Sequence, residues 1–200
     1  MTTPDPTLIL ISTSLAWFAL ARVTPKHEAT LVLAGGCFWG VEAVFEHVRG
    51  VRAVVSGFAR PSDAEPGFVP VEAVRVSYDP SSVTPSQLLT IFYTVAHDPT
   101  SRDRQGPDVG PEYRAIVFYQ TGEVRQAAVA AAAEFTHSAQ RARPVVTEIR
   151  PLGTFDLAES FHQDYSSRHP NDPYVTINDL PKVAALKHRF PTLYQDQRAP

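Results

Sequence analysis

The chain holds a single cysteine, Cys37, in the stretch GCFWG. The thiolate form of cysteine is a strong nucleophile and is also the form that is readily oxidised. Residues 30–35 read as a short apolar strand ending in glycines, and residues 37–50 carry apolar side chains at helical spacing. A thiol at the start of a helix lies near unpaired N–H groups and the positive end of the helix dipole, so we expect its pKa to be lowered.

The neighbours of this cysteine suit a site that handles a small apolar group. Gly35 and Gly36 allow a sharp turn and a close approach of a ligand to the backbone. Phe38 and Trp39 can form an apolar, electron-rich wall beside the sulfur, which fits a methyl or thioether group. The same residues also fit a second interpretation, in which Cys37 is a buried structural thiol among core aromatics.

A carboxyl group on an apolar strand face, that of Glu72, is a candidate general acid. Residues 71–79, VEAVRVSYD, read as a strand, and alternation puts Glu72 on one face with Val74, Val76 and Tyr78. A carboxyl on that face is desolvated, so we expect its pKa to rise and the group to serve as a general acid near neutral pH. The alternative is a glutamate at a strand end that reaches water.

A long polar loop supplies further hydrogen-bonding groups. Residues 97–112 form no periodic pattern, and loops of this length in compact domains are usually functional or disordered. Asp108 and Tyr113 lie on or beside its glycine-rich part. Taken alone, this pattern is also that of an ordinary turn.

Strands and helices alternate along the rest of the chain. Strands are expected at 30–35, 51–59, 71–79, 113–120 and 144–151, and helices at 37–50, 86–96, 123–141, 158–168 and 180–191. Split βαβ units of this kind indicate an α+β fold, and we expect one domain over residues 28–200.

Composition excludes several classes of function. The net charge of -3 and the isoelectric point near 6.1 come without a basic stripe, which argues against a nucleic-acid partner. One cysteine excludes an intrachain disulfide and any zinc site that needs several thiolates. The histidines form no HxxxH or HxH pair, so we expect no metal site.

The first 27 residues need a separate interpretation. Residues 8–20 form an apolar run of signal-peptide length, but no Lys or Arg precedes it. Residues 1–27 are therefore a weak export signal, an N-terminal extension packed on the domain, or the product of a start codon placed too far upstream. The localisation stays open: the cytoplasm is favoured, and the periplasm applies if residues 1–21 are a signal peptide.

Together these stretches resemble the peptide methionine sulfoxide reductase A family. The resemblance covers about residues 30 to 190 and rests on GCFWGVEAVF, EAVRVSYDP, HDPT, RQGPDVGPEYR and AESFHQDY, in that order. It implies a two-layer α+β sandwich around a ferredoxin-like mixed sheet core. The closing INDLPKVAALKHRFP is similar to the tail of members that lack the usual C-terminal recycling cysteines.

The resemblance also implies an activity and its residues. Cys37 would attack the sulfur of methionine S-sulfoxide, free or in proteins, and become a sulfenic acid while Glu72 protonates the oxygen. The implied substrate-binding residues are Phe38, Trp39, Asp108, Tyr113 and Tyr174. No cofactor is implied, and we expect a monomer. Without a second cysteine, an external thiol such as thioredoxin, glutaredoxin or glutathione must reduce Cys37.

One segment departs from the family pattern. Between Gly57 and Glu72 the chain is several residues shorter than usual and lacks both the tyrosine that bonds the sulfoxide oxygen and the histidine before the catalytic glutamate. Phe58 also replaces a tyrosine. We therefore expect a reductase that is slower or altered in substrate, with an inactive relative as the alternative.

Three other functions fit a single reactive cysteine. A cysteine hydrolase would need a histidine partner, for which His97 and His162 are candidates by residue type. A redox sensor would form a sulfenic acid with peroxide and release no methionine. A purely structural domain would leave the folded thiol inert.

Overall fold

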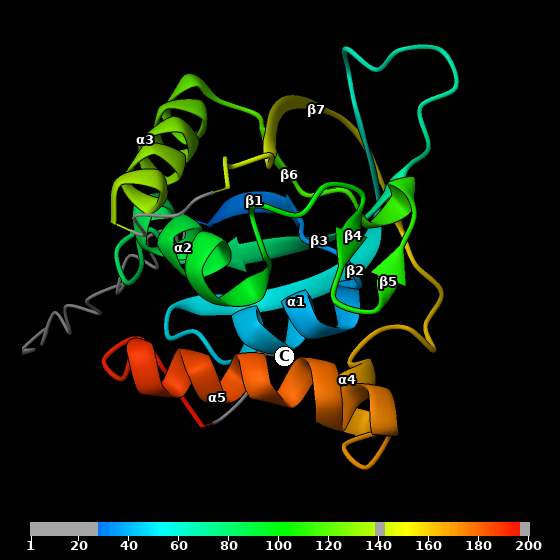
Figure 1. Ribbon diagram of the computed structural model, residues 1–200. Helices are drawn as coiled ribbons and strands as arrows, with labels where there is room; N and C mark the ends of the chain where they lie inside the picture. Colours follow the sequence, from blue (N-terminus) through cyan, green and yellow to red (C-terminus); the bar gives the residue numbers. More distant parts are fainter. Residues whose placement is uncertain (1–27, 139–142, 197–200) are drawn as a thin grey trace, which may run out of the picture.

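Five strands form a closed ring in the computed structural model, which describes residues 28–138 and 143–196 (Figure 1). The strands are β1 (Ala29–Ala34), β2 (Val51–Pro61), β3 (Val71–Tyr78), β6 (Ile116–Tyr119) and β7 (Glu148–Leu157). Their order around the ring is β1-β3-β2-β7-β6, and β6 pairs again with β1. Every pairing is antiparallel except that of β6 with β7, which is parallel.

The helices lie outside this ring. They are α1 (Phe38–Glu46), α2 (Pro85–Ile91), α3 (Gly122–Ser138), α4 (Tyr165–Arg168) and α5 (Leu180–Arg189). Two π-helices, η1 (Phe92–Ala96) and η3 (Val175–Asp179), continue α2 and lead into α5. The helix α1 lies between the strands and α5 (Figure 1). Among the residues that the structure describes, no helix is long and apolar enough to cross a membrane.

The predicted long loop contains structure of its own. A small hairpin pairs β4 (Arg104–Gln105) with β5 (Asp108–Val109), and the 3-10 helix η2 (Pro111–Tyr113) follows. This compact segment ends directly before β6, so it carries Asp108 and Tyr113 to the end of the ring where β1 stops.

Two apolar clusters fill the molecule, one on each side of the strands. The larger packs α1, α2 and α3 against Leu31, Leu33, Val74 and Val76. Strand residues alternate between faces, so the second cluster is on the inside of the ring. It contains Val32, Ala34, Ala59, Phe68, Val71, Ala73, Ile116 and Phe118.

The fold confirms the prediction of an α+β protein with a mixed sheet. The predicted two-layer sandwich is not confirmed, because β7 joins β2 to β6 and the sheet has no free edge. The strand expected at 144–151 lies at Glu148–Leu157, and the helix expected over 158–168 is helical only at Tyr165–Arg168. The predictions for residues 1–27 fall outside the described part of the chain.

Candidate active site

The only thiol of the chain lies at the turn between β1 and α1, as predicted. Cys37 is the N-cap of α1 and its residue is 8% exposed. Gly36, just before it, has φ of +88°. A Cβ on Gly36 would come within 2.3 Å of the Cβ of Gln105, so both the backbone angle and the space require glycine here.

Glu72 lies directly beside this turn. The backbone N–H of Phe38 donates a hydrogen bond of 3.1 Å to Oε2 of Glu72, and the carboxyl also forms a hydrogen bond with the Cys37 thiol. Burial raises the pKa of Glu72 to about 7, with further contributions from the negative charges of Asp108 and Glu112. The predicted rise in the pKa of this carboxyl is confirmed, and its cause is the predicted one.

The prediction of a lowered thiol pKa is wrong. Burial, and then the negative charge of Glu72, raise the pKa of Cys37 to about 12. Hydrogen bonds with the backbone of Trp39 and the side chain of Tyr174 act in the opposite direction but are weaker. The free thiol is therefore protonated at neutral pH, because desolvation of the thiolate outweighs the helix terminus.

An aromatic cluster covers the helix start. Phe38 is 2% exposed and its ring meets Phe58 edge-on at 5.7 Å between centroids. Trp39 stacks on Tyr165 at 3.7 Å, and its ring also meets that of Tyr174 nearly at right angles at 5.7 Å. The aromatic wall predicted from Phe38 and Trp39 thus also includes the rings of Phe58, Tyr165 and Tyr174.

Sequence reasoning assigned no role to Tyr165 and considered His162 only as a possible base. In the structure, Nε1–H of Trp39 donates to Nδ1 of His162 at 3.3 Å. Both His162 and Tyr165 orient the Trp39 ring from a segment more than 120 residues away along the chain. The stretch FHQDY was the available signal, because it belongs to the motifs that carry the family resemblance.

One of the polar residues predicted on the long loop, Asp108, meets Tyr174. The hydroxyl of Tyr174 donates a hydrogen bond to Oδ2 of Asp108 and also bonds the thiol of Cys37. Burial, and then the charges of Glu72 and Asp108, raise the pKa of Tyr113 to about 12. Burial also raises the pKa of Tyr174, so both tyrosines keep their protons at neutral pH and can donate hydrogen bonds. Of the other six predicted site residues, Phe38 and Trp39 follow Cys37 in the chain, Glu72, Tyr113 and Tyr174 interact with its thiol, and Asp108 lines the same cavity.

A cavity of about 230 Å³ opens beside the sulfur. Cys37, Asp108 and Tyr174 line it, together with Lys182 and residues of the β4–β5 hairpin. Phe38, Trp39, Glu72 and Tyr113 do not belong to its lining. Cys37 thus borders this cavity and also interacts with Glu72, which lies outside the lining.

The geometry disfavours a cysteine hydrolase. Nδ1 of His97 bonds the carbonyl oxygen of Phe92 at 2.9 Å, and Nε2 bonds the Thr147 hydroxyl at 2.8 Å. Burial lowers the pKa of His97 to about 4, and Nδ1 of His162 bonds Trp39. A general base for Cys37 needs a free ring nitrogen within hydrogen-bond reach of the thiol, and both nitrogens of His97 are occupied.

Comparisons with known proteins agree with this geometry. The family model described as peptide methionine sulfoxide reductase matches residues 29–193. A peptide methionine sulfoxide reductase from Mesorhizobium japonicum is 41% identical over 184 residues, which cover 88% of this chain and 94% of that protein. One from Synechocystis is 37% identical, with 94% and 87% covered.

Solved structures show the same fold. Reduced Mxr1 from Saccharomyces cerevisiae superposes with a TM-score of 0.64 at 26% identity, covering 74% of this chain and 89% of that one. Methionine sulfoxide reductase A from Corynebacterium diphtheriae superposes with a TM-score of 0.59 at 30% identity, covering 74% and 78%. The chain therefore belongs to the peptide methionine sulfoxide reductase family, the enzymes that reduce methionine sulfoxide with the help of thiols.

Proposed function

We propose that this chain reduces the S epimer of methionine sulfoxide, with Cys37 as the nucleophile and Glu72 as the acid. The observation that carries the proposal is the pairing of the only thiol with a carboxyl whose pKa is raised to about 7. An acid of that pKa is half protonated at neutral pH, which is the best state for donating a proton there.

The proton balance follows from this pairing. Protonation of Glu72 removes its negative charge, which is the second cause of the raised pKa of Cys37. The sulfoxide sulfur carries partial positive charge and, facing the Cys37 sulfur, favours the thiolate. Glu72 then gives its proton to the sulfoxide oxygen and regains one from the thiol. The Cys37 sulfur forms a bond to the sulfoxide sulfur. The protonated S–O bond then breaks as its hydroxyl passes to the Cys37 sulfur, and the bond between the two sulfurs breaks with its electron pair returning to the substrate. Cys37 is thereby oxidised to a sulfenic acid, and the sulfoxide is reduced to methionine.

The remaining predicted residues support binding in this proposal. Tyr113 would donate a hydrogen bond toward the sulfoxide oxygen. The one hydroxyl proton of Tyr174 goes to Asp108 in the free enzyme, so Tyr174 would donate to the sulfoxide oxygen only by turning this proton away from Asp108 when substrate binds. Phe38 and Trp39 would hold the methyl group. Such a pocket takes over part of the role of the tyrosine that the shortened segment lacks.

We also infer a ferredoxin-like core within the closed sheet. The strands β6-β1-β3-β2 are neighbours in that order, and α1 and α2 connect them in a βαββαβ sequence. This is the split βαβ arrangement. The strand β7 then adds to both of its edges, which supports a ferredoxin-like core closed by one extra strand.

Recycling of Cys37 needs a thiol from outside, because the chain has no other cysteine. A thiolate attacks the sulfenic sulfur and displaces hydroxide, which leaves as water after protonation, and a second thiol then releases Cys37 from the mixed disulfide. Thioredoxin, glutaredoxin and glutathione are the proposed reductants. Mxr1, which shares the fold, has been solved in complex with Trx2.

This scheme predicts ping-pong kinetics. The sulfoxide and the thiol must reach the same buried sulfur at different times, so double-reciprocal plots of rate against sulfoxide concentration should be parallel at several fixed thiol concentrations. The measurement is steady-state methionine formation with glutathione, glutaredoxin or thioredoxin as the reductant. Lines that intersect would show that both substrates bind together and would contradict the scheme.

A further inference from the structure

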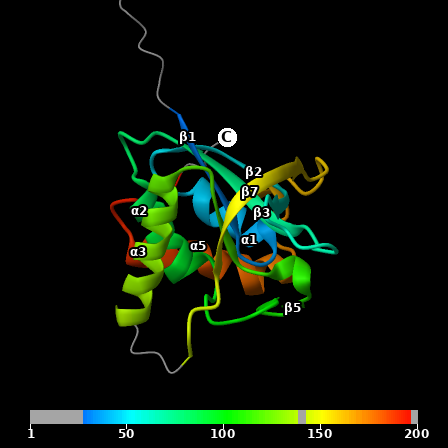
Figure 2. The same cartoon turned by 90° about the horizontal axis from the view of Figure 1, so that it is seen from above.

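The shortened segment before Glu72 forms a folded cap on the ring. It consists of residues 62–70, the loop between β2 and β3, and its Phe68 is 6% exposed. The Phe68 ring packs with the apolar cluster inside the ring, alongside Val71 and Ile116. Phe68 therefore closes the end of the ring from which Glu72 and Tyr113 project. Figures 1 and 2 show this loop on the opposite side of the molecule from α3.

Three arginines surround the Phe68 ring. The guanidinium carbons of Arg60, Arg114 and Arg150 lie 5.6, 5.5 and 5.9 Å from its centroid. Arg60 also donates to the carbonyl oxygen of Phe68 at 2.7 Å. Cations over an aromatic ring are attracted to its face, so these contacts hold Phe68 in the ring end.

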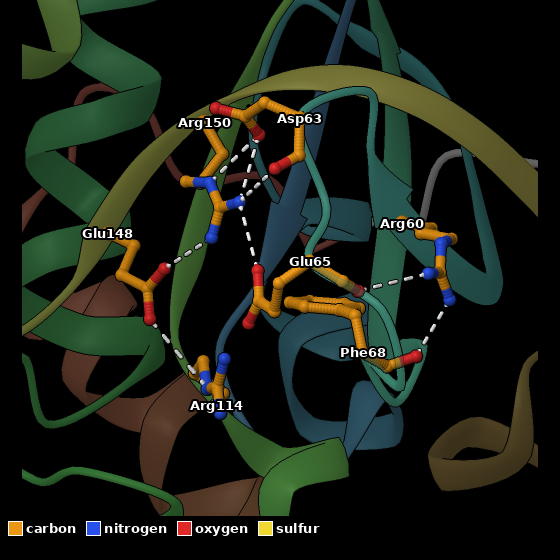
Figure 3. A network of polar contacts seen from close by, with 7 residues as sticks. All are labelled: Arg60, Asp63, Glu65, Phe68, Arg114, Glu148 and Arg150. Carbon is orange, nitrogen blue, oxygen red and sulfur yellow. Dashed lines mark hydrogen bonds and ion pairs between the residues drawn. The ribbon is translucent and has the colours of Figure 1, made fainter.

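Arg150, on β7, makes the largest number of polar contacts among the three (Figure 3). Its guanidinium bonds the Asp63 carboxylate at 2.9 Å and the Asp63 carbonyl oxygen at 3.0 Å. It also bonds Glu65 at 3.4 Å and Glu148 at 3.1 Å. The Arg150 side chain is 19% exposed. A partly buried guanidinium that bonds several oxygens holds its partners in position better than an exposed ion pair does.

The same network reaches the other side of the site. Glu148 lies between Arg150 and Arg114, with 3.7 Å to Nε of Arg114. Arg114 also bonds Asp103 at 3.0 Å. Arg114 is the residue directly after Tyr113, and the 62–70 cap is followed by Val71 and Glu72. The chain segments that carry the acid and the tyrosine are therefore tied to one guanidinium.

We propose that Arg150 is a positioning residue, which holds the 62–70 cap closed and thereby fixes Glu72 and Tyr113 against Cys37. This inference rests on the proposed role of Glu72. The cap is the segment in which the chain departs from the family pattern.

A closed cap has a measurable electrostatic consequence. Burial is the first cause of the raised pKa of Glu72. The titratable groups with the largest effects on this carboxyl are Asp108, Glu112 and Cys37, and the carboxyl acts in turn on Tyr113.

Glu72 lies on the outer face of β3, with Val74 and Val76, whereas Phe68 packs with the cluster on the inner face. Opening of the cap therefore acts on Glu72 by loosening the start of β3, which moves the carboxyl out of its buried place beside the N–H of Phe38. Water then reaches Glu72, and its pKa falls toward its ordinary value.

The test compares Arg150→Met with Arg52→Met. Arg52 also pairs with a carboxylate, Asp79, and its side chain is 21% exposed, but it lies at the far end of β2 and β3. We expect Arg150→Met to lower kcat for methionine formation by about tenfold or more. The pH at which the rate falls to half should also move down by about one unit. Arg52→Met should leave both unchanged.

Two further variants separate the possible outcomes. Glu148→Gln weakens the link to Arg114 while Arg150 keeps Asp63, so it should move the pH midpoint in the same direction by a smaller amount, even if Arg150→Met folds poorly. An Arg150→Met enzyme with the wild-type pH midpoint would overturn the positioning role, and so would an equal loss in Arg52→Met. If Glu72→Gln kept full activity, the proposed function itself would fail, whatever Arg150 does.

Discussion

Glu72→Gln is expected to lower the rate of methionine formation in a single turnover by a factor of about 10² to 10⁴. The amide keeps the size of the carboxyl and can still meet the backbone N–H of Phe38, but it cannot give a proton to the sulfoxide oxygen. In the wild-type enzyme the same rate should fall as the pH rises above about 7, where Glu72 loses its proton. Rapid-quench measurement of methionine between pH 5 and 9 tests both expectations.

Stability distinguishes lost chemistry from lost folding in this variant. The folded-state pKa of Glu72, about 7, lies above the ordinary value of 4.5. The folded state therefore binds this proton more tightly than the unfolded state, and stability falls as the pH rises from 4.5 to 7. Glu72→Gln removes this loss, so at pH 8 the variant should gain about 1 to 3 kcal/mol in free energy of unfolding. A variant that is inactive and less stable at pH 8 would contradict this account of the site.

Gly36→Ala is expected to lower the free energy of unfolding by about 2 to 4 kcal/mol and to disable the enzyme. The left-handed φ of +88° costs about 1 to 2 kcal/mol for a residue with a Cβ. The new Cβ would also meet the Cβ of Gln105 at 2.3 Å. The side chain of Gln105 bonds both the N–H and the carbonyl oxygen of Asp98, at 2.8 and 2.9 Å, so its displacement disturbs the cavity wall next to Cys37.

Gly67→Ala is the matched control for this substitution. Gly67 has a similar φ of +83°, but a Cβ there would have no neighbour within 4 Å. This variant should lose only the backbone cost, about 1 to 2 kcal/mol. Urea unfolding of both variants gives the difference. Equal losses in free energy of unfolding would show that a Cβ fits at Gly36. Close packing would then not explain why a glycine precedes Cys37.

Local patterns in the sequence predicted the parts of the site that depend on local structure. The strand–turn–helix around Cys37 follows from a short apolar run, glycines and helical spacing. Alternation along β3 placed Glu72 on the face of the larger core, and the raised pKa followed from that face. The face of a strand and the start of a helix are properties of neighbouring residues, so no long-range contact had to be known.

Other features depend on residues far apart in the chain. The direction of the Cys37 pKa shift was wrong because burial by distant segments outweighs the local helix terminus. The closed sheet depends on β7 meeting both β2 and β6, which no strand pattern specifies. The bond between Arg150 and Asp63 joins residues 87 positions apart, and neither side chain differs by type from an ordinary surface charge.

The most direct test of the central claim counts methionine in the absence of reductant. Purified enzyme is mixed with excess S- or R-methionine sulfoxide, and the methionine released per enzyme is measured for the wild type and for Cys37→Ser. We predict about one methionine per Cys37 from the S epimer, none from the R epimer, and none from Cys37→Ser, because one thiol can accept one oxygen atom. If the wild type released no methionine from either epimer, the segment missing before Glu72 would have disabled the site, and reduction through Cys37 would be contradicted.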